Sequence, residues 1–334
     1  MSRDGPGLLL RDIQRGEDAQ VLAAASVIAM ASPDVLLLTG FDWDLDLLAL
    51  AAFNQLLTRR GAGFAYSLSL RPNTGLMTEA DLDGDGRLRG PGDAQGWGQF
   101  SGQGGMAILS RLPVDTAGVT DLSGRLWRDL PGHLIDGAGL SPAAQEVQRL
   151  SSTGHWVVPV LLPSGDRLTL LAWQATPPVF DGAEDRNGRR NHDEAAIWLR
   201  LLEGALSEAP PQAPFVLIGN ANLDPADGEG RADALLSLLS DPRLQDPRPA
   251  SSGGAAAATP GQAGDPALDT ADWPETSDAG TPGPGNLRVD YVLPSADLRV
   301  SASGVWWPAP GDPAAAEATL ASRHRLVWVD VETD

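Results

Sequence analysis

The chain has 334 residues, a formal net charge of −20, no cysteine and no lysine, so all 24 of its basic residues are arginines. Without cysteine it has no disulfides or thiolate metal sites, and no apolar run approaches the roughly 18 to 20 residues that cross a bilayer. The acidic field argues against a nucleic-acid partner unless a local basic patch overrides it. The length suits a single α/β domain over residues 1–334.

The first part of the chain alternates helical and strand patterns. Residues 2–16 form a polar segment, and apolar spacing then predicts a helix over Asp18–Met30. Val35–Leu38 is a continuous apolar run, typical of a strand buried on both faces, and it leads into the loop Thr39–Asp42. A further helix is predicted over Leu45–Leu57.

A long acidic, glycine-rich insertion runs from residue 71 to residue 105. Asp81, Asp83 and Asp85 stand at alternate positions, followed by a glycine at the sixth place, which matches the first half of a calcium-binding loop. The second half does not match, because the twelfth position is Gly92 rather than a bidentate glutamate. Two interpretations remain: a structural calcium ion that braces the insertion, or a solvated acidic turn.

The middle of the chain carries further strand patterns. Two of them form a predicted hairpin across a Pro-Ser-Gly-Asp turn, and residues 113–149 give no clear prediction. The predicted strands are Gly104–Arg111, Val157–Leu162, Leu168–Trp173 and Phe215–Ile218.

The remaining segments complete the expected pattern. Helices are predicted over Ala195–Leu206, with Asn191 or Asp193 as the cap, and over Arg231–Leu239. Residues 247–285 are a low-complexity Pro/Gly/Ala/Ser stretch, expected to lie on the surface and to bury little. The last two predicted strands are Asn286–Pro294 and Leu326–Val331.

Four motifs in these segments resemble one known family. They are GMAILSR at 105–111, ATPPVFDG…DRNGRRNHDE at 175–194, FVLIGNANLDP at 215–225 and NLRVDYVLP at 286–294. The chain resembles the endonuclease/exonuclease/phosphatase superfamily, which includes deoxyribonuclease I, and in particular a bacterial branch with the second motif. The resemblance covers nearly the whole chain. It implies a two-layer β-sandwich flanked by helices and a magnesium-dependent hydrolysis of phosphoesters.

The resemblance also assigns places to the catalytic groups, and several are substituted. Gly40 stands for the metal-binding glutamate, Gln174 for a catalytic histidine, Asn220 for the water-orienting aspartate and Arg323 for the aspartate that steers the last histidine; Asn222, Asp290 and His324 are retained. Glutamine and asparagine keep hydrogen bonding but take up no proton at neutral pH. The family mechanism is therefore expected to be impaired, and a nearby Arg323 is expected to lower the pKa of His324.

Other side chains are candidates for binding. Asp42 offers a carboxylate from the loop beyond Gly40, either to a metal or as a helix cap. His155 resembles a substrate-side residue, although a lone histidine at a strand start is more often structural. The group formed by Arg186, Asn187 and Arg190 would suit an anion, and its alternative is a salt-bridged loop.

The resemblance further implies a strand that immediately precedes a segment like Ser2–Gly7 and ends at the metal. Either the start codon lies further upstream than Met1 or the molecule lacks a central strand, and the first interpretation is preferred. The chain as given shows no signal peptide, but an upstream start would leave room for one, so a periplasmic or secreted location stays open.

Three functions follow from these patterns. The first is a diverged, catalytically impaired family member that binds a small anionic ligand. The second is an active phosphoesterase with a rearranged metal centre formed by Asn222, Asp290, His324 and Asp42. The third is a calcium-stabilised binding protein without enzymatic activity. Neither the substrate nor the oligomeric state can be predicted from the sequence.

Overall fold

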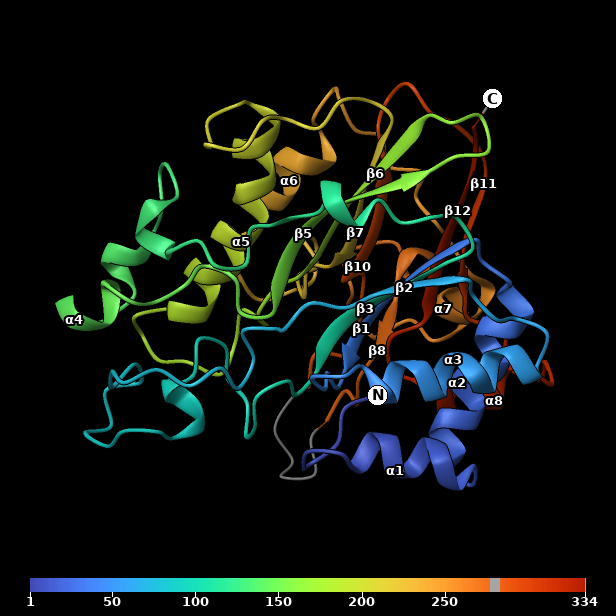
Figure 1. Ribbon diagram of the computed structural model, residues 1–334, viewed down its shortest axis with the longest axis horizontal. Helices are drawn as coiled ribbons and strands as arrows, with labels where there is room; N and C mark the ends of the chain where they lie inside the picture. The colour runs from blue at the N-terminus through green and yellow to red at the C-terminus, as the bar shows by residue number, and fades with distance from the viewer. Residues whose placement is uncertain (277–282, 334) are drawn as a thin grey trace.

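The computed structural model describes residues 1–276 and 283–333. Its two main sheets lie face to face, and helices cover both outer faces (Figure 1). Among the described residues, no helix combines the length and apolar character needed to cross a membrane.

The larger sheet has the order β10-β7-β6-β5-β4. Its strands β6 and β7 are parallel, and the remaining neighbours are antiparallel. The strands are β4 (Thr120–Asp121), β5 (Gly154–Leu161), β6 (Arg167–Gln174), β7 (Phe215–Asn220) and β10 (Asp290–Pro294).

The other strands form three smaller sheets. A three-stranded sheet has the order β1-β3-β2, and two-stranded sheets pair β11 with β12 and β8 with β9. The strands are β1 (Val35–Phe41), β2 (Tyr66–Leu68), β3 (Gly105–Ser110), β8 (Ala271–Asp272), β9 (Asn286–Leu287), β11 (Arg299–Trp306) and β12 (Leu326–Glu332).

The continuous apolar runs of the sequence arise because both faces of these strands are buried. On β6, Leu170 faces the core between the two sheets, whereas Leu171 faces the helices on the outside. Ile108 and Leu109 on β3 divide in the same way. Successive side chains of a strand point to opposite faces, so a strand with two buried faces has no polar alternation.

The helices lie in two groups. Around the larger sheet, α5 and α6 supply Ile197, Trp198 and Leu235 to the core, and α1 to α3 pack on the smaller sheet through residues such as Phe53. The helices are α1 (Leu8–Arg15), α2 (Ala19–Ala31), α3 (Leu48–Arg59), α4 (Pro142–Gln145), α5 (Arg186–Leu202), α6 (Asp233–Leu239), α7 (Ser252–Ala256) and α8 (Ala315–Ala321).

Several predicted boundaries are wrong. The segment 2–16 contains the helix α1, and α5 begins at Arg186 rather than Ala195. Within 247–285, Leu268 and Ala271 are buried, against the expectation that this stretch buries little, and 277–282 lie outside the described residues. These segments are rich in polar residues, which predicted loops. In the structure, polar residues of these segments make tertiary hydrogen bonds.

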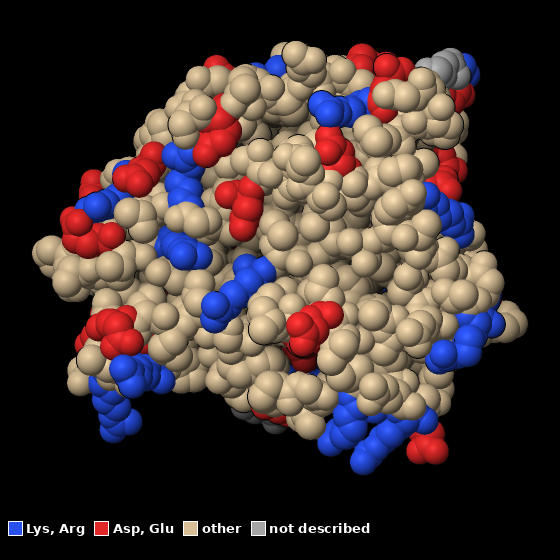
Figure 2. Space-filling model, viewed as in Figure 1, with Lys and Arg blue, Asp and Glu red and all other residues tan. Residues whose placement is uncertain are grey.

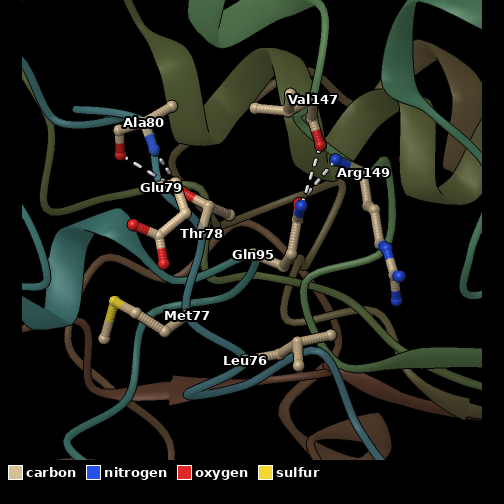
Figure 3. Close-up of a pocket in the computed structure, with 8 residues that line it drawn as sticks. All are labelled: Leu76, Met77, Thr78, Glu79, Ala80, Gln95, Val147 and Arg149. Atoms are coloured by element: carbon tan, nitrogen blue, oxygen red, sulfur yellow. Dashed lines mark hydrogen bonds between the residues drawn. The ribbon is translucent and has the colours of Figure 1, made fainter.

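The insertion 71–105 is held against the main body by side-chain hydrogen bonds. Gln95 Nε2 donates to the carbonyl of Val147, and Gln95 Oε1 accepts the N–H of Arg149. These residues and Leu76 to Ala80 line a cavity of about 360 Å³ (Figure 3). Asn73, which is fully buried, donates to the carbonyls of Ser123 and Ser151.

On the face drawn in Figure 2, uncharged side chains cover a broad area right of the centre, and acidic and basic side chains lie in small mixed groups at the left, near the middle and along the rim. No continuous basic track crosses this face.

Because the insertion packs closely on the main body, adding one methyl group at Gly96 should destabilise the protein. A Cβ placed on Gly96 would lie 1.8 Å from the carbonyl oxygen of Ser152, which is backbone and gives way poorly. We expect Gly96→Ala to lower the free energy of unfolding by about 1–3 kcal/mol or more in urea denaturation. Gly124→Ala is the matched control, since a Cβ there meets no atom within 4 Å; equal effects of the two substitutions would contradict tight docking.

Candidate active site

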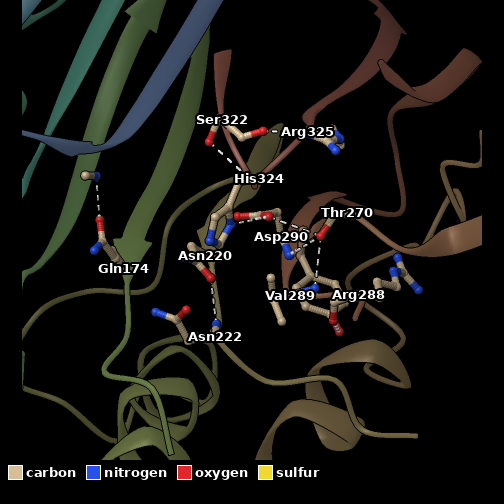
Figure 4. Close-up of polar contacts among 12 residues, drawn as sticks. Gln174, Asn220, Asn222, Thr270, Arg288, Val289, Asp290, Ser322, His324 and Arg325 are labelled. Carbon is tan, nitrogen blue, oxygen red and sulfur yellow. Dashed lines mark hydrogen bonds and ion pairs between the residues drawn. The ribbon is translucent and has the colours of Figure 1, made fainter. Parts of the chain in front are cut away.

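Three neighbouring strands bring polar side chains to one edge of the larger sheet. Gln174 on β6 is paired in register with Asn220 on β7, and Asn220 is paired with Asp290 on β10. Residues at matched register share a face and lie on strands about 4.8 Å apart. These side chains line one central cavity of about 1670 Å³ together with Gly40, Asn222 and His324 (Figure 4).

Gly40 joins this edge from the smaller sheet through a β-bulge. The register of β1 against β3 shifts between Thr39 and Phe41, and Gly40 is the extra residue, with φ of 64°. Its N–H donates to Gln174 Oε1 at 3.0 Å. Because that backbone donor fixes the orientation of the amide, Gln174 presents its NH₂ group to other partners.

The two asparagines of the β7 loop are fixed in the same manner. Asn220 Oδ1 accepts the N–H of Asn222 at 2.7 Å, so the Asn220 NH₂ group faces away from that loop. Asn222, which has a left-handed φ of 50°, donates its own NH₂ to the carbonyl of Ala175 at 2.7 Å. The substituted amides therefore work as oriented hydrogen-bonding groups.

Asp290 and His324 form an ion pair, with 2.8 Å between Asp290 Oδ2 and His324 Nδ1. Thr270 Oγ1 donates to the same carboxylate at 3.1 Å and accepts the N–H groups of Val289 and Asp290. Trp273 packs edge-on against the imidazole, with ring centroids 5.2 Å apart. A hydroxyl group and an aromatic ring thus fix the positions of the carboxylate and the imidazole.

The pKa of His324 is raised above its ordinary value. Burial works against the charged imidazole, but the charge and hydrogen bond of Asp290 outweigh it. The expectation that Arg323 lowers this pKa is therefore wrong. Arg323 is exposed and does not line the cavity, whereas Asp290 takes the steering place beside the histidine.

A buried polar network on α5 supports the strand ends. Asn191 donates to the carbonyls of Thr176 and Ala221 at 2.7 Å each, and so ties the loop after β6 to the loop after β7. Glu194 accepts the N–H groups of Ser152 and Thr176, and burial raises its pKa to about 7. The DRNGRRNHDE motif is thus largely a scaffold for the site.

The predicted anion-binding residues do not converge on the cavity. Arg190 is buried and donates to four carbonyls of the segments 95 and 149–151, and Arg186 donates to the carbonyls of Leu82 and Ala138. Asn187 donates to the carbonyl of Val179. These side chains thus bond to backbone carbonyls, and among the described residues neither arginine forms an ion pair of the predicted salt-bridged loop.

His155 and Asp42 are likewise used for structure. His155 is fully buried and bonds Ser151 Oγ and the carbonyl of Glu194, and its pKa falls to about 4 because of burial. Asp42 accepts hydrogen bonds from Ser2 Oγ and the N–H groups of residues 3 and 104, which occupy both of its oxygens. The helix cap that was the alternative for Asp42 is made instead by Asp44, which accepts the N–H groups of Leu48 and Ala49.

A comparison of the chain with models of protein families shows which family it belongs to. The model described as "Endonuclease/Exonuclease/phosphatase family" matches residues 13–324. The chain belongs to this family. A comparison with curated proteins found no match.

Solved structures of family members share the fold. An endonuclease/exonuclease/phosphatase from Beutenbergia cavernae DSM 12333 aligns with a TM-score of 0.56 and 18% identity, over 93% of this chain and 65% of that one. A family protein from Leptotrichia buccalis C-1013-b aligns with a TM-score of 0.50 and 14% identity, over 96% and 94%. The chain spans about two thirds of the Beutenbergia protein, and the predicted deoxyribonuclease I-like fold is confirmed.

The magnesium ion expected of the family does not fit these residues. Position 40 offers no side-chain ligand, and the side-chain oxygens of Gln174 and Asn220 accept backbone hydrogen bonds. Asp290 is the remaining carboxylate of the described cluster, and it is paired with His324. Magnesium prefers an octahedral set of hard oxygens, usually with one or two free carboxylates.

The three carboxylates of the acidic loop in the insertion lie close together. Carboxylate oxygens of Asp81, Asp83 and Asp85 lie within 4.8 Å of one another. Gly92 packs against Asp83, so a glutamate at that twelfth position would clash, and Asp93 instead closes the loop by accepting the N–H groups of residues 82 and 90. Calcium at this loop stays a prediction.

Sequence reasoning missed Thr270 and Trp273, which contact the Asp290–His324 pair of this family member. Both lie in the low-complexity stretch 247–285, where composition gives no signal. It also missed the role of Asn191, which was interpreted as a cap.

The ion pair predicts a pH dependence of stability. Because the folded pKa of His324 is raised, the pair stabilises fully below the ordinary pKa of about 6.5, and its contribution is lost as pH rises through the folded value. We expect Asp290→Asn to abolish this dependence and to bring the imidazole pKa, measured by NMR titration, below 6.5. Asp272→Asn, which removes a carboxylate paired with Arg325, is the control and leaves the profile intact. An unchanged His324 titration in Asp290→Asn would contradict the assignment.

The calcium prediction has a direct test. If the loop binds calcium, the melting temperature rises with millimolar calcium and falls with a chelator, because a ligand that binds only the folded state stabilises it. The variant Asp83→Asn should lose most of this shift, whereas Asp166→Asn, in an exposed turn, should keep it. Identical melting temperatures with calcium and with chelator would leave a solvated acidic turn.

Proposed function

We propose that the chain is a diverged family member whose site binds a small anion through amide and imidazole donors, without catalysing metal-dependent phosphoester hydrolysis. The observation that carries this proposal is the orientation of the two amides. Gln174 and Asn220 turn their oxygens to the backbone N–H groups of Gly40 and Asn222, so their NH₂ groups remain to donate.

The charge of His324 completes the donor set. The raised pKa extends the pH range in which the imidazolium form is present; in that form both ring nitrogens donate, and Nδ1 is occupied by Asp290. Nε2 then remains for a ligand at the edge where Asn220 and Asp290 are paired. Charge-assisted hydrogen bonds of this kind are about twice as strong as neutral ones, which favours a phosphate, phosphomonoester or carboxylate group.

The impaired mechanism follows from the same groups. A general base must titrate near neutrality, and an amide at position 174 does not. A metal needs free carboxylates, and position 40 has no side chain to supply one. Loss of one catalytic group commonly lowers a rate by orders of magnitude, and here several are absent together.

The Asp290–His324 pair favours a second candidate, an active phosphoesterase with a rearranged centre. A histidine oriented by a carboxylate is a common general base. Its metal would rely on Asp290 and Asn222 alone, since Asp42 is engaged with the N-terminal segment and does not line the cavity. We therefore prefer the binding function.

The binding proposal predicts titration behaviour. Inorganic phosphate should bind in the presence of EDTA by isothermal titration calorimetry, with an affinity that falls as pH rises through the pKa of His324. Asn220→Asp should weaken binding at least tenfold, since it replaces a donor by a negative charge. Gln99→Glu adds the same charge at an exposed residue outside the cavity and is the matched control.

Assays with nitrophenyl phosphate mono- and diesters separate the two candidates. We expect no turnover with magnesium or manganese. Turnover that requires either metal and disappears in Asn222→Ala or His324→Ala would overturn the binding proposal and establish the rearranged enzyme.

A further inference from the structure

Phe180, in the loop between β6 and α5, combines two features that rarely occur together. The residue is 90% exposed, and its backbone has a left-handed φ of 69°. A single exposed apolar side chain is common on proteins, but a bulky residue in the left-handed region is an outlier, because its Cβ crowds the backbone. Strained residues of this kind cluster at sites that bind ligands, where the surrounding structure holds them in place.

Both chain neighbours of Phe180 are held by Asn187 in the first turn of α5. Asn187 Nδ2 donates to the carbonyl of Val179 at 2.7 Å, and the N–H of Asn187 donates to Asp181 Oδ2 at 2.5 Å. Residues 177 and 178, just before this segment, are prolines, which fix φ. The backbone on each side of Phe180 is therefore restrained, whereas its ring is left in solvent.

The same loop is attached to the loop after β7 at two further places. A Cβ on Gly230 would lie 2.8 Å from the Cβ of Pro178, so the two loops are in close contact. Near the start of α5, Asp185 Oδ2 accepts a hydrogen bond from Arg231 Nε at 2.7 Å. Because the loop is fixed at both ends, the position of Phe180 relative to the strand ends is set by the fold.

The loop that carries Phe180 starts at the candidate anion site. Gln174, the last residue of β6, and Pro177 both line the central cavity, and Phe180 follows Pro177 by three residues. Three residues span at most about 11 Å, so the backbone of Phe180 lies within that distance of the cavity wall. A phenylalanine side chain and the aromatic group of a phosphate ester can together bridge such a distance.

We propose that Phe180 is a specificity-determining residue, whose ring packs on an aromatic group carried by the anion that the strand-end site binds. This inference rests on the proposed anion-binding function and names its ligand class, an aryl phosphomonoester. Aromatic pairs contribute affinity beyond the area that they bury. A ring on a restrained backbone also loses little conformational freedom when a ligand packs on it, which lowers the entropic cost of binding.

Isothermal titration calorimetry in EDTA, with inorganic phosphate and naphthyl phosphate as the two probes, tests the proposal. We expect the chain to bind naphthyl phosphate about fivefold more tightly than inorganic phosphate. Phe180→Ala should lose this preference, and Phe180→Trp, which keeps an aromatic ring, should retain it. Leu236→Ala is the matched control, because Leu236 is also an exposed apolar residue but does not line the cavity; it should retain the preference.

Phe180→Gly separates ligand binding from folding. Glycine adopts a left-handed φ without strain, so the melting temperature of this variant should be at least as high as that of the parent chain, while the preference for naphthyl phosphate is lost. A clearly lower melting temperature would assign the ring a structural role and overturn the proposal.

The two probes also distinguish failure of this inference from failure of the anion site. Binding of inorganic phosphate without a preference for naphthyl phosphate would overturn the inference alone. An unchanged preference in Phe180→Ala, or an equal weakening of both probes in that variant, would do the same. No binding of inorganic phosphate by the parent chain would instead reject the anion site, and the inference with it.

Discussion

The site depends on the lateral alignment of three strands that end at one edge. Gln174, Asn220 and Asp290 lie side by side because β6, β7 and β10 are paired in that register. A shift by one residue would turn these side chains to the opposite face. The ladder of the larger sheet therefore sets the geometry of the site, and the loops supply the remaining groups.

Buried polar groups on α5 maintain that alignment. Asn191 bridges the loops after β6 and β7, and Arg190 gathers carbonyls from the segment before β5. Buried groups of this kind are costly when unpaired, so the network restrains the loops to one arrangement. The two arginines that the sequence suggested for an anion, Arg186 and Arg190, donate instead to backbone carbonyls.

Part of this structure could be predicted from the sequence. Runs such as FVLI at 215–218 indicated strands with two buried faces, and the motifs indicated which strand ends meet. The start of α5 could not be predicted, because Asn191, Asp193 and Glu194 are polar yet lie inside the protein. Thr270 was hidden in a stretch of low complexity, and the partner of His324 became evident only from tertiary contacts.

The central claim is that the strand-end site recognises an anion and not a divalent metal. A crystal soaked with phosphate and manganese tests it in one experiment, because manganese is located by its anomalous scattering. The account predicts phosphate density within hydrogen-bonding distance of Asn220 Nδ2 and His324 Nε2, with no manganese peak beside it. A manganese peak coordinated by Asp290 and Asn222 would contradict the account.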